Sequence, residues 1–144
     1  MSGRAIVRFN EDINSPGFEV INWDYEQLAE PGTRDPLHPS WVICPETREY
    51  VWKFRFGVMV SQPCLYLTVD LSKSDGTTLK KMVRNNPSVS PQTELFDIRL
   101  SPVTANAVAG EYIKLNVLTE PQVPFTVHGI NCPHSNPDPL LQQT

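Results

Sequence analysis

The stretch from Tyr50 to Val60, YVWKFRFGVMV, decides the fold of this chain. Apolar side chains occupy every second position of this stretch, and Lys53, Arg55 and Gly57 are among the residues between them. A period of two is that of a β-strand, in which successive side chains point to opposite faces of a sheet. The pattern therefore predicts a long strand with one fully apolar face, which must pack against a second sheet.

Alternation of the same kind recurs on both sides of this stretch. Residues 65–71 carry leucine or valine at every second position, and the Asp75-Gly76 pair that follows favours a hairpin turn into residues 77–83. Shorter alternations predict further strands at residues 5–9, 18–23, 41–44, 96–100, 112–117 and 125–130. Residues 25–28 allow at most a single helical turn. About nine strands predict an all-β fold, a jelly-roll β-sandwich of about 8–10 antiparallel strands.

The length and composition fit one such domain. A chain of 144 residues falls in the range of a single domain, and 14 prolines against 7 glycines suit many short strands joined by turns. We predict that the jelly-roll domain occupies residues 1–131. Residues 132–144 hold Pro133, Pro137 and Pro139, and proline cannot donate a hydrogen bond inside a sheet. We therefore predict a proline-rich C-terminal tail there, and not a central strand.

The charge distribution argues against two classes of partner. The formal net charge is -4, and no run of Lys or Arg supplies the cation cluster that nucleic acid or an anionic membrane requires. The longest strongly apolar run, residues 56–60, is far too short to span a bilayer. The opening residues lead into a polar alternating stretch and not into a secretory signal. We expect no nucleic acid or membrane partner and no cleaved export signal.

Cysteine and histidine form no pattern of a metal or catalytic site. Cys44, Cys64 and Cys132 cannot all pair within one chain, and their spacing matches no zinc motif, so we expect reduced thiols that are mostly buried. His134 stands two residues after Cys132 and His128 lies on a predicted strand, but a zinc site needs four ligands at closer spacing. The Gly-x-Ser-x-Gly elbow of hydrolases does not occur. We predict no catalytic residue, no metal site and no cofactor.

The tryptophans are candidates for stacking against a sugar. Trp52 lies on the apolar face of its predicted strand and Trp41 shares a face with Ile43, so core packing accounts for both. Trp23 ends its predicted strand beside Asp24, and we nominate this pair as a ligand contact. The alternative for Asp24 is a solvated loop rim, because no calcium-binding spacing accompanies it.

The segments of the chain follow one another in an informative order. The relevant segments are residues 6–9, 20–24, 41–45, 49–54, 67–76 and 110–115, together with Asp35. This order resembles that of the tumour necrosis factor-like jelly rolls, and especially of the globular heads of the first complement component. The apolar closing strand of that family has only a poor counterpart, because Pro139 precedes Leu140 and Leu141. The resemblance implies a jelly-roll fold and a tendency to form homotrimers.

Two tyrosines lie on the polar faces of predicted strands whose opposite faces are apolar. Tyr66 alternates with apolar residues of one strand, and Tyr112 lies with Asn116 on the polar face of another. Tyrosine on an outward sheet face is typical of protein interfaces, where the ring is covered and the hydroxyl stays wet. We predict that Tyr66, Tyr112 and Asn116 belong to the interface of the homotrimer that the resemblance implies. Scattered surface tyrosines are the alternative.

These features together predict a non-enzymatic jelly-roll protein that acts as a homotrimer in a surface assembly. The expected setting is the virion surface, where the protein is a viral or phage capsid decoration protein or the head of a fibre. Its expected partners are other capsid or surface-assembly proteins and a glycan or protein receptor. The alternatives are a carbohydrate-binding lectin-like module, a metal-dependent jelly-roll enzyme, and a soluble cytoplasmic location.

Overall fold

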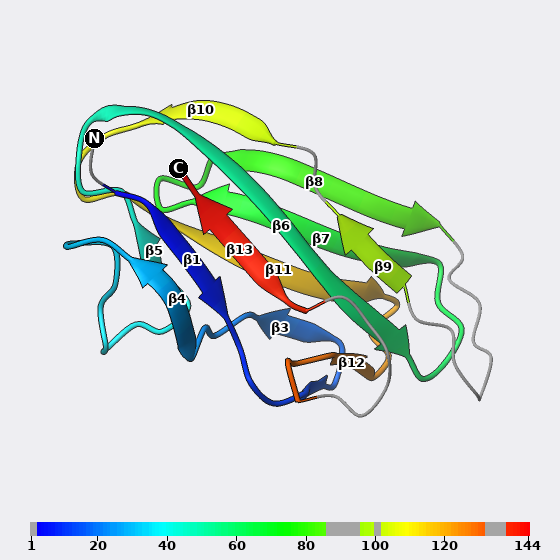
Figure 1. Ribbon diagram of the computed structural model, residues 1–144. Coiled ribbons are helices and arrows are strands. Elements are labelled where there is room, and N and C mark those ends of the chain that lie inside the picture. The colour runs from blue at the N-terminus through cyan, green and yellow to red at the C-terminus, as the bar shows by residue number, and fades with distance from the viewer. Residues whose placement is uncertain (1–2, 86–95, 100–101, 132–137) are drawn as a thin grey trace.

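A computed structural model describes residues 3–85, 96–99, 102–131 and 138–144 of the chain. Every regular element in these residues is a β-strand (Figure 1). The strands are β1 (Ala5–Arg8), β2 (Ile13–Ser15), β3 (Phe18–Val20), β4 (Tyr25–Ala29), β5 (Val42–Ile43), β6 (Arg48–Val60), β7 (Tyr66–Lys73), β8 (Thr78–Asn85), β9 (Phe96–Arg99), β10 (Val103–Ala107), β11 (Tyr112–Glu120), β12 (Phe125–Val127) and β13 (Leu140–Gln143). The described ranges contain no helix long and apolar enough to cross a membrane. The all-β prediction is confirmed.

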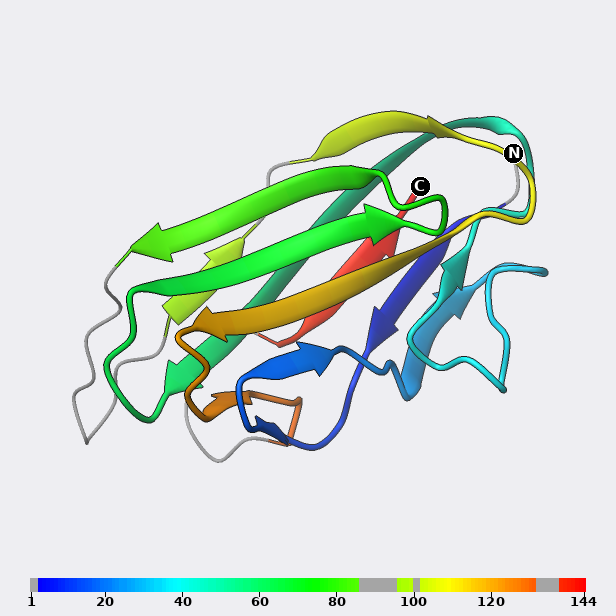
Figure 2. The ribbon, with the colours of Figure 1, turned by 180° about the vertical axis from the view of Figure 1, so that it is seen from behind.

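The strands form two antiparallel sheets that pack face to face. The eight-stranded sheet has the order β2-β12-β6-β13-β1-β4, and β9 and β10 also pair with β6. The five-stranded sheet has the order β3-β11-β7-β8, and β5 also pairs with β11. Figure 1 is viewed from the side of the eight-stranded sheet, and Figure 2 shows the five-stranded sheet in front. Strand neighbours come from distant parts of the chain, as the predicted jelly-roll sandwich requires.

The core lies between the sheets, and β6 contributes its largest side chains. The apolar face of β6 is at most 4% exposed and consists of Tyr50, Trp52, Phe54, Phe56, Val58 and Val60. The inward residues of β7 and β11 belong to the same core cluster: Leu67, Val69, Leu71, Ile113, Leu115 and Val117. Each large apolar side chain buried in this way contributes roughly 1.5–3 kcal/mol. The period-two stretch is thus the main structural determinant that the sequence indicated.

The C-terminal strand β13 shows that the prediction of a tail over residues 132–144 is wrong at its end. β13 lies between β1 and β6, where Leu141 pairs with Val7 on one side and with Phe54 on the other. Leu141 is 1% exposed and therefore part of the core. Proline disfavours a central strand only where it stands within it, and Pro139 precedes β13. The rest of the predicted tail, at residues 132–137, lies outside the described residues.

The side chain of Gln143 anchors the end of β13 inside the sandwich. Its Oε1 accepts a hydrogen bond of 2.9 Å from Nε1 of Trp52. Its Nε2 donates to the backbone oxygens of Gly3 at 2.7 Å and Ile43 at 3.0 Å. A buried amide is stable only when such partners are present. Gln143 therefore links β13 to β6 and to two other segments of the chain.

Residues 25–28, which were expected to form a helical turn at most, belong to strand β4. β4 pairs with β1 from Ala5 opposite Ala29 to Arg8 opposite Tyr25, with a register shift between Ile6 and Val7. This pairing satisfies the backbone of a stretch whose side chains lack a clear period. Tertiary context therefore overrides the weak local preference.

Candidate functional site

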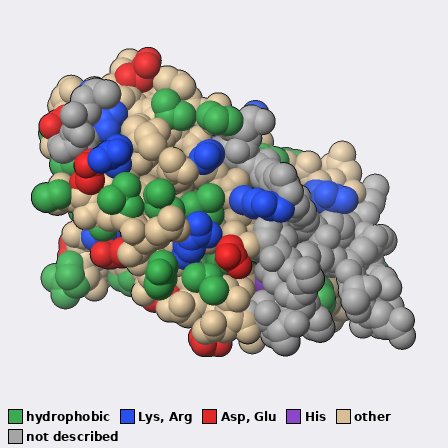
Figure 3. All heavy atoms as spheres, viewed as in Figure 1, with side chains coloured by type: hydrophobic (Ala, Val, Ile, Leu, Met, Phe, Trp, Pro, Cys, Tyr) green, Lys and Arg blue, Asp and Glu red, His purple; other side chains and the backbone are tan. Residues whose placement is uncertain are grey.

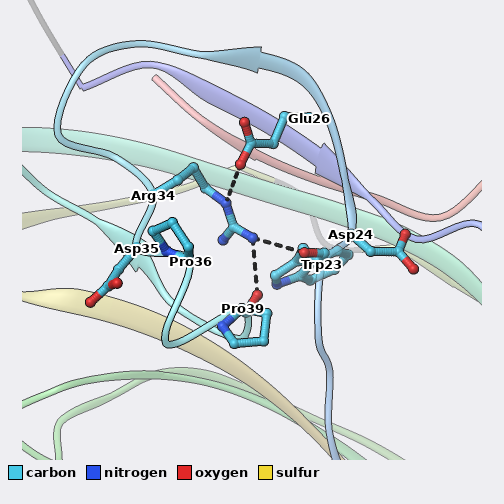
Figure 4. Close-up of a pocket in the computed structure, with 7 residues that line it drawn as sticks. All are labelled: Trp23, Asp24, Glu26, Arg34, Asp35, Pro36 and Pro39. Atoms are coloured by element: carbon cyan, nitrogen blue, oxygen red, sulfur yellow. Dashed lines mark hydrogen bonds and ion pairs between the residues drawn. The ribbon is translucent and has the colours of Figure 1, made fainter.

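A pocket of about 400 Å³ opens beside β4, under the loop of residues 30–41. It is lined by Trp23, Asp24, Glu26, Arg34, Asp35, Pro36 and Pro39 (Figure 4). The loop has no strand of its own between β4 and β5. The pocket brings together Trp23 and Asp24, the two residues that the sequence nominated for ligand contact.

The guanidinium of Arg34 holds the loop on the end of β4. Nη2 of Arg34 donates to the backbone oxygens of Trp23 at 2.8 Å and Pro39 at 3.1 Å. Nη1 donates to the backbone oxygen of Trp41. Nε lies 3.2 Å from Oε1 of Glu26 (Figure 4). The side chain of Arg34 is only 11% exposed. Its donors are therefore committed to structural bonds.

An aromatic stack fastens the same loop to the five-stranded sheet. The rings of His38 and Trp41 are stacked with centroids 3.7 Å apart. The ring of Tyr112, on β11, is stacked on the ring of Trp41, also with centroids 3.7 Å apart. Nδ1 of His38 lies 3.0 Å from Oδ2 of Asp35. Hydrogen bonding to His38 holds the pKa of the Asp35 carboxyl below its usual value. Tyr112 is therefore engaged in a contact within one chain.

The structure overturns the expectation that Trp23 is an exposed contact. Trp23 is 1% exposed, and its ring packs against Phe9 with centroids 5.8 Å apart. The loop of residues 30–41 covers the end of the strand, and this long-range contact cannot be read from local alternation. Nε1 of Trp23 is buried and has no hydrogen-bond partner among the described residues. A sugar cannot stack on this ring.

Asp24 lies at the rim of the pocket and has a structural partner. Its Oδ1 accepts hydrogen bonds from the backbone nitrogen of Asn10 at 2.9 Å and from Nδ2 of Asn10 at 3.2 Å. Figure 4 shows the carboxylate pointing away from Arg34. Within the described ranges, no group of three or more His, Cys, Asp or Glu side chains could hold a metal ion. The pocket is therefore a hollow with a mixed apolar and polar lining around one buried arginine.

The three predicted interface residues fall on the five-stranded sheet, and two of them face outward together. Tyr66 is 43% exposed on β7, and Asn116 is half-buried on β11. Asn116 pairs with Asp70, and Tyr66 pairs with Glu120. Alternate residues share a face, so Tyr66 and Asn116 lie on the outer face two rows apart. Tyr112 shares the face but is covered by Trp41.

Comparison with known proteins decides the fold family. No protein family model matches the chain, and no curated protein matches it. The globular domain of zebrafish complement 1qA protein matches with a TM-score of 0.64 and 9% identity, covering 99% of this chain and 96% of that one. Eiger TNF from S. frugiperda matches with a TM-score of 0.59 and 15% identity, covering 97% and 89%. Murine APRIL matches with a TM-score of 0.54 and 10% identity, covering 86% and 97%.

The chain has the C1q-like and tumour necrosis factor-like jelly-roll fold. The predicted resemblance is thereby confirmed. At these identities the comparison establishes the fold alone.

One outer surface of this jelly roll mixes apolar and basic side chains. It belongs to the eight-stranded sheet, whose outward residues alternate with the buried ones of β1, β6 and β13. Its half-buried apolar members are Ile6, Leu28, Val51, Met59 and Leu140. Figure 3 shows hydrophobic side chains spread over this side of the molecule, with Lys and Arg among them. We call this surface the eight-stranded outer face.

The opposite surface of the jelly roll carries exposed apolar residues that the sequence did not reveal. Phe18 on β3 is 48% exposed and Val83 on β8 is 49% exposed. Phe18 was placed in a predicted strand without an outward assignment, and β8 has no clean alternation to reveal its faces. The register of β8 against β7 supplies that information. We call this surface the five-stranded outer face.

Proposed function

We propose that this jelly roll is a non-enzymatic binding domain that acts as a homotrimer in a surface assembly. The proposal is supported by the fold that it shares with a C1q globular domain and two tumour necrosis factor-like proteins. It is also supported by the pocket, where the buried guanidinium of Arg34 is committed to structural bonds. We therefore place the binding surfaces on the outer faces of the two sheets.

The eight-stranded outer face carries the trimer proposal. Arg55 pairs with Leu140, and Nη1 of Arg8 donates to the backbone oxygen of Pro139, so two cations flank Leu140. A twofold contact centred on β13, the strand of Leu140, would place Arg8 against Arg55 of the other copy, with like charges opposed. A threefold contact joins two different surfaces and avoids this conflict. The apolar residues of the face then pack against another part of the neighbour.

This assignment moves the threefold contact away from the residues that the sequence nominated. Tyr66, Tyr112 and Asn116 lie on the five-stranded sheet, on the other side of the sandwich. Tyr112 is also covered by Trp41. We therefore assign the threefold contact to the eight-stranded outer face, and leave Tyr66 and Asn116 for a different contact.

The finer proposal concerns the setting, which is a viral or phage particle with the domain as a capsid decoration protein or fibre head. It is supported by Cys44 and Cys64, which are both buried and unpaired, as in proteins made in a reducing compartment. Other capsid proteins and a glycan or protein receptor are the proposed partners. Three equivalent patches on one axis would convert weak single contacts into strong overall binding. Imaging or crosslinking of the native assembly tests this setting.

Sedimentation of the protein and of matched variants tests the trimer. We expect wild-type protein at micromolar concentration to contain three copies through this contact. Leu140→Glu should abolish it, because a carboxylate replaces an apolar contact while Arg8 and Arg55 stabilise it within one copy. Ser72→Glu, on the other outer face, is the control and should keep three copies. A wild-type protein without a threefold contact at this concentration contradicts the trimer and leaves the fold intact.

A further inference from the structure

The outer face of the five-stranded sheet carries a row of three apolar side chains and one threonine that crosses four strands. Phe18 on β3 pairs with Leu118 on β11, Leu118 pairs with Thr68 on β7, and Thr68 pairs with Val83 on β8. Directly paired residues point to the same side of a sheet. The neighbouring residue Val117 is fully buried in the core, so the row points outward. Both ends of the row are about half exposed, whereas Thr68 within it is 3% exposed.

Two polar rows lie on either side of the apolar row. One row runs Val20, Asn116, Asp70 and Lys81 across the same four strands. The other runs Glu120, Tyr66 and Asn85. The registered pairing fixes the order of these side chains along each row. The positions of these side chains are therefore known well enough to ask whether the face is complementary to the same face of a second copy.

One carboxylate oxygen of this face has no hydrogen-bond partner among the residues that the structure describes. Oδ1 of Asp70 is buried, and no hydrogen-bond donor reaches it among the described residues. Burial raises the pKa of the Asp70 carboxyl, and the charge of Lys81 opposes this shift. A buried polar atom without a partner carries a free-energy penalty. A side-chain shift that exposes this oxygen to a donor from outside the chain would remove that penalty.

We propose that this face binds the same face of a second copy of the chain, about a twofold axis parallel to the strands between β11 and β7. Such an axis exchanges the strands in pairs, so that β11 lies over the partner's β7 and β3 lies over the partner's β8. Phe18 then faces the partner's Val83, and the two apolar rows cover each other. Sheets pack in this way about 10 Å apart with interdigitating side chains.

The charges of the face complement their own image under this axis. Asp70 faces the partner's Asn116, whose amide can donate to the Asp70 carboxylate once a side-chain shift exposes the oxygen that lacks a donor. Glu120 faces the partner's Tyr66, whose hydroxyl can donate to it. Lys81 faces the partner's Val20. A twofold interface must be self-complementary, and this face opposes no two charges of the same sign.

The second copy differs from the trimer of the proposed function in symmetry and in surface. The threefold contact uses the other side of the sandwich, so either contact can form without the other. Where both form, a threefold and a twofold axis together generate a larger closed or extended assembly. The twofold contact is therefore additional to the proposed trimer and independent of it.

Two double variants with equal loss of apolar surface test the twofold contact. F18K/V83K places lysine against lysine across the axis, whereas F18E/V83K places glutamate against lysine. Within one copy the two positions are three strand spacings apart, roughly 14 Å, so the new charges interact weakly there. We expect F18K/V83K to weaken the contact at least about a hundredfold relative to F18E/V83K. Sedimentation over a concentration series measures this difference, and circular dichroism verifies that both variants fold.

A covalent test gives a second measurement of the same geometry. Treatment of F18C/V83C with a bismaleimide crosslinker that spans the roughly 10 Å between packed sheets should join two copies through covalent bonds from position 18 to position 83, identified by mass spectrometry of the linked peptides. Bonds from 18 to 18, or equal weakening in both charge variants, would overturn the proposed axis. A wild-type protein that shows no pairing of copies up to several hundred micromolar would overturn the contact itself. A wild-type protein that forms trimers that do not pair would refute the twofold contact and leave the trimer standing. A protein that forms only dimers would refute the trimer and leave the twofold contact standing.

Discussion

Arg34 is the residue on which the loop of residues 30–41 depends most. Its guanidinium donates to three backbone oxygens, those of Trp23, Pro39 and Trp41. Lysine at this position cannot reproduce the planar fork that serves several acceptors at once. Arg34→Lys should therefore lower the free energy of unfolding by about 2 kcal/mol, because carbonyl oxygens lose their donors. Urea unfolding monitored by tryptophan fluorescence measures the change.

Arg4 provides a matched control for that prediction. It also forms an ion pair with a glutamate, Glu30, at 3.1 Å, but its side chain is 56% exposed. Exposed ion pairs contribute little because water screens them. Arg4→Lys should leave the urea midpoint nearly unchanged. Equal effects of the two substitutions would show that Arg34 does not anchor the loop.

At the scale of the element, β13 determines whether the eight-stranded sheet is continuous. Gln143→Ala removes the acceptor of Trp52 Nε1 and the donor to Gly3 and Ile43. We expect a loss of about 3 kcal/mol in the free energy of unfolding, because a cavity and unpaired polar atoms are left in the core. Thermal unfolding measures it. Gln142→Ala, on the outward face of the same strand, is the control, and a comparable loss there would contradict this role of Gln143.

The elements differ in how far the sequence could predict them. β6 and the β7–β8 hairpin follow from a period of two and an Asp-Gly turn, which are local signals. β13 has only four residues after Pro139, and its place between β1 and β6 arises from pairing with residues more than 80 positions away. Local patterns carry no information about such contacts.

The candidate site shows the same division. The sequence nominated Trp23 and Asp24, and both line the pocket. It could not show that Trp23 is buried, because its ring packs against Phe9 and Arg34 fixes the neighbouring loop, and alternation along a strand encodes neither contact. It also could not identify Phe18 and Val83 as one surface, because their relation depends on the order of four strands.

At the scale of the whole molecule, Cys44 reports on the opening of the sandwich. Its thiol is fully buried beside Gln143, and burial, aided by the charge of Glu111, raises its pKa to about 12. Only a thiolate reacts with an alkylating reagent. At pH 8 we therefore expect Cys44 to be labelled only through global unfolding, roughly 10⁴-fold or more slower than an exposed thiol. Mass spectrometry of labelled peptides measures the rate.

Cys64, which is 8% exposed beside β7, is the internal control and should be labelled faster through local opening. Labelling of Cys44 at the rate of Cys64 would mean that the two sheets separate locally at this end of the sandwich.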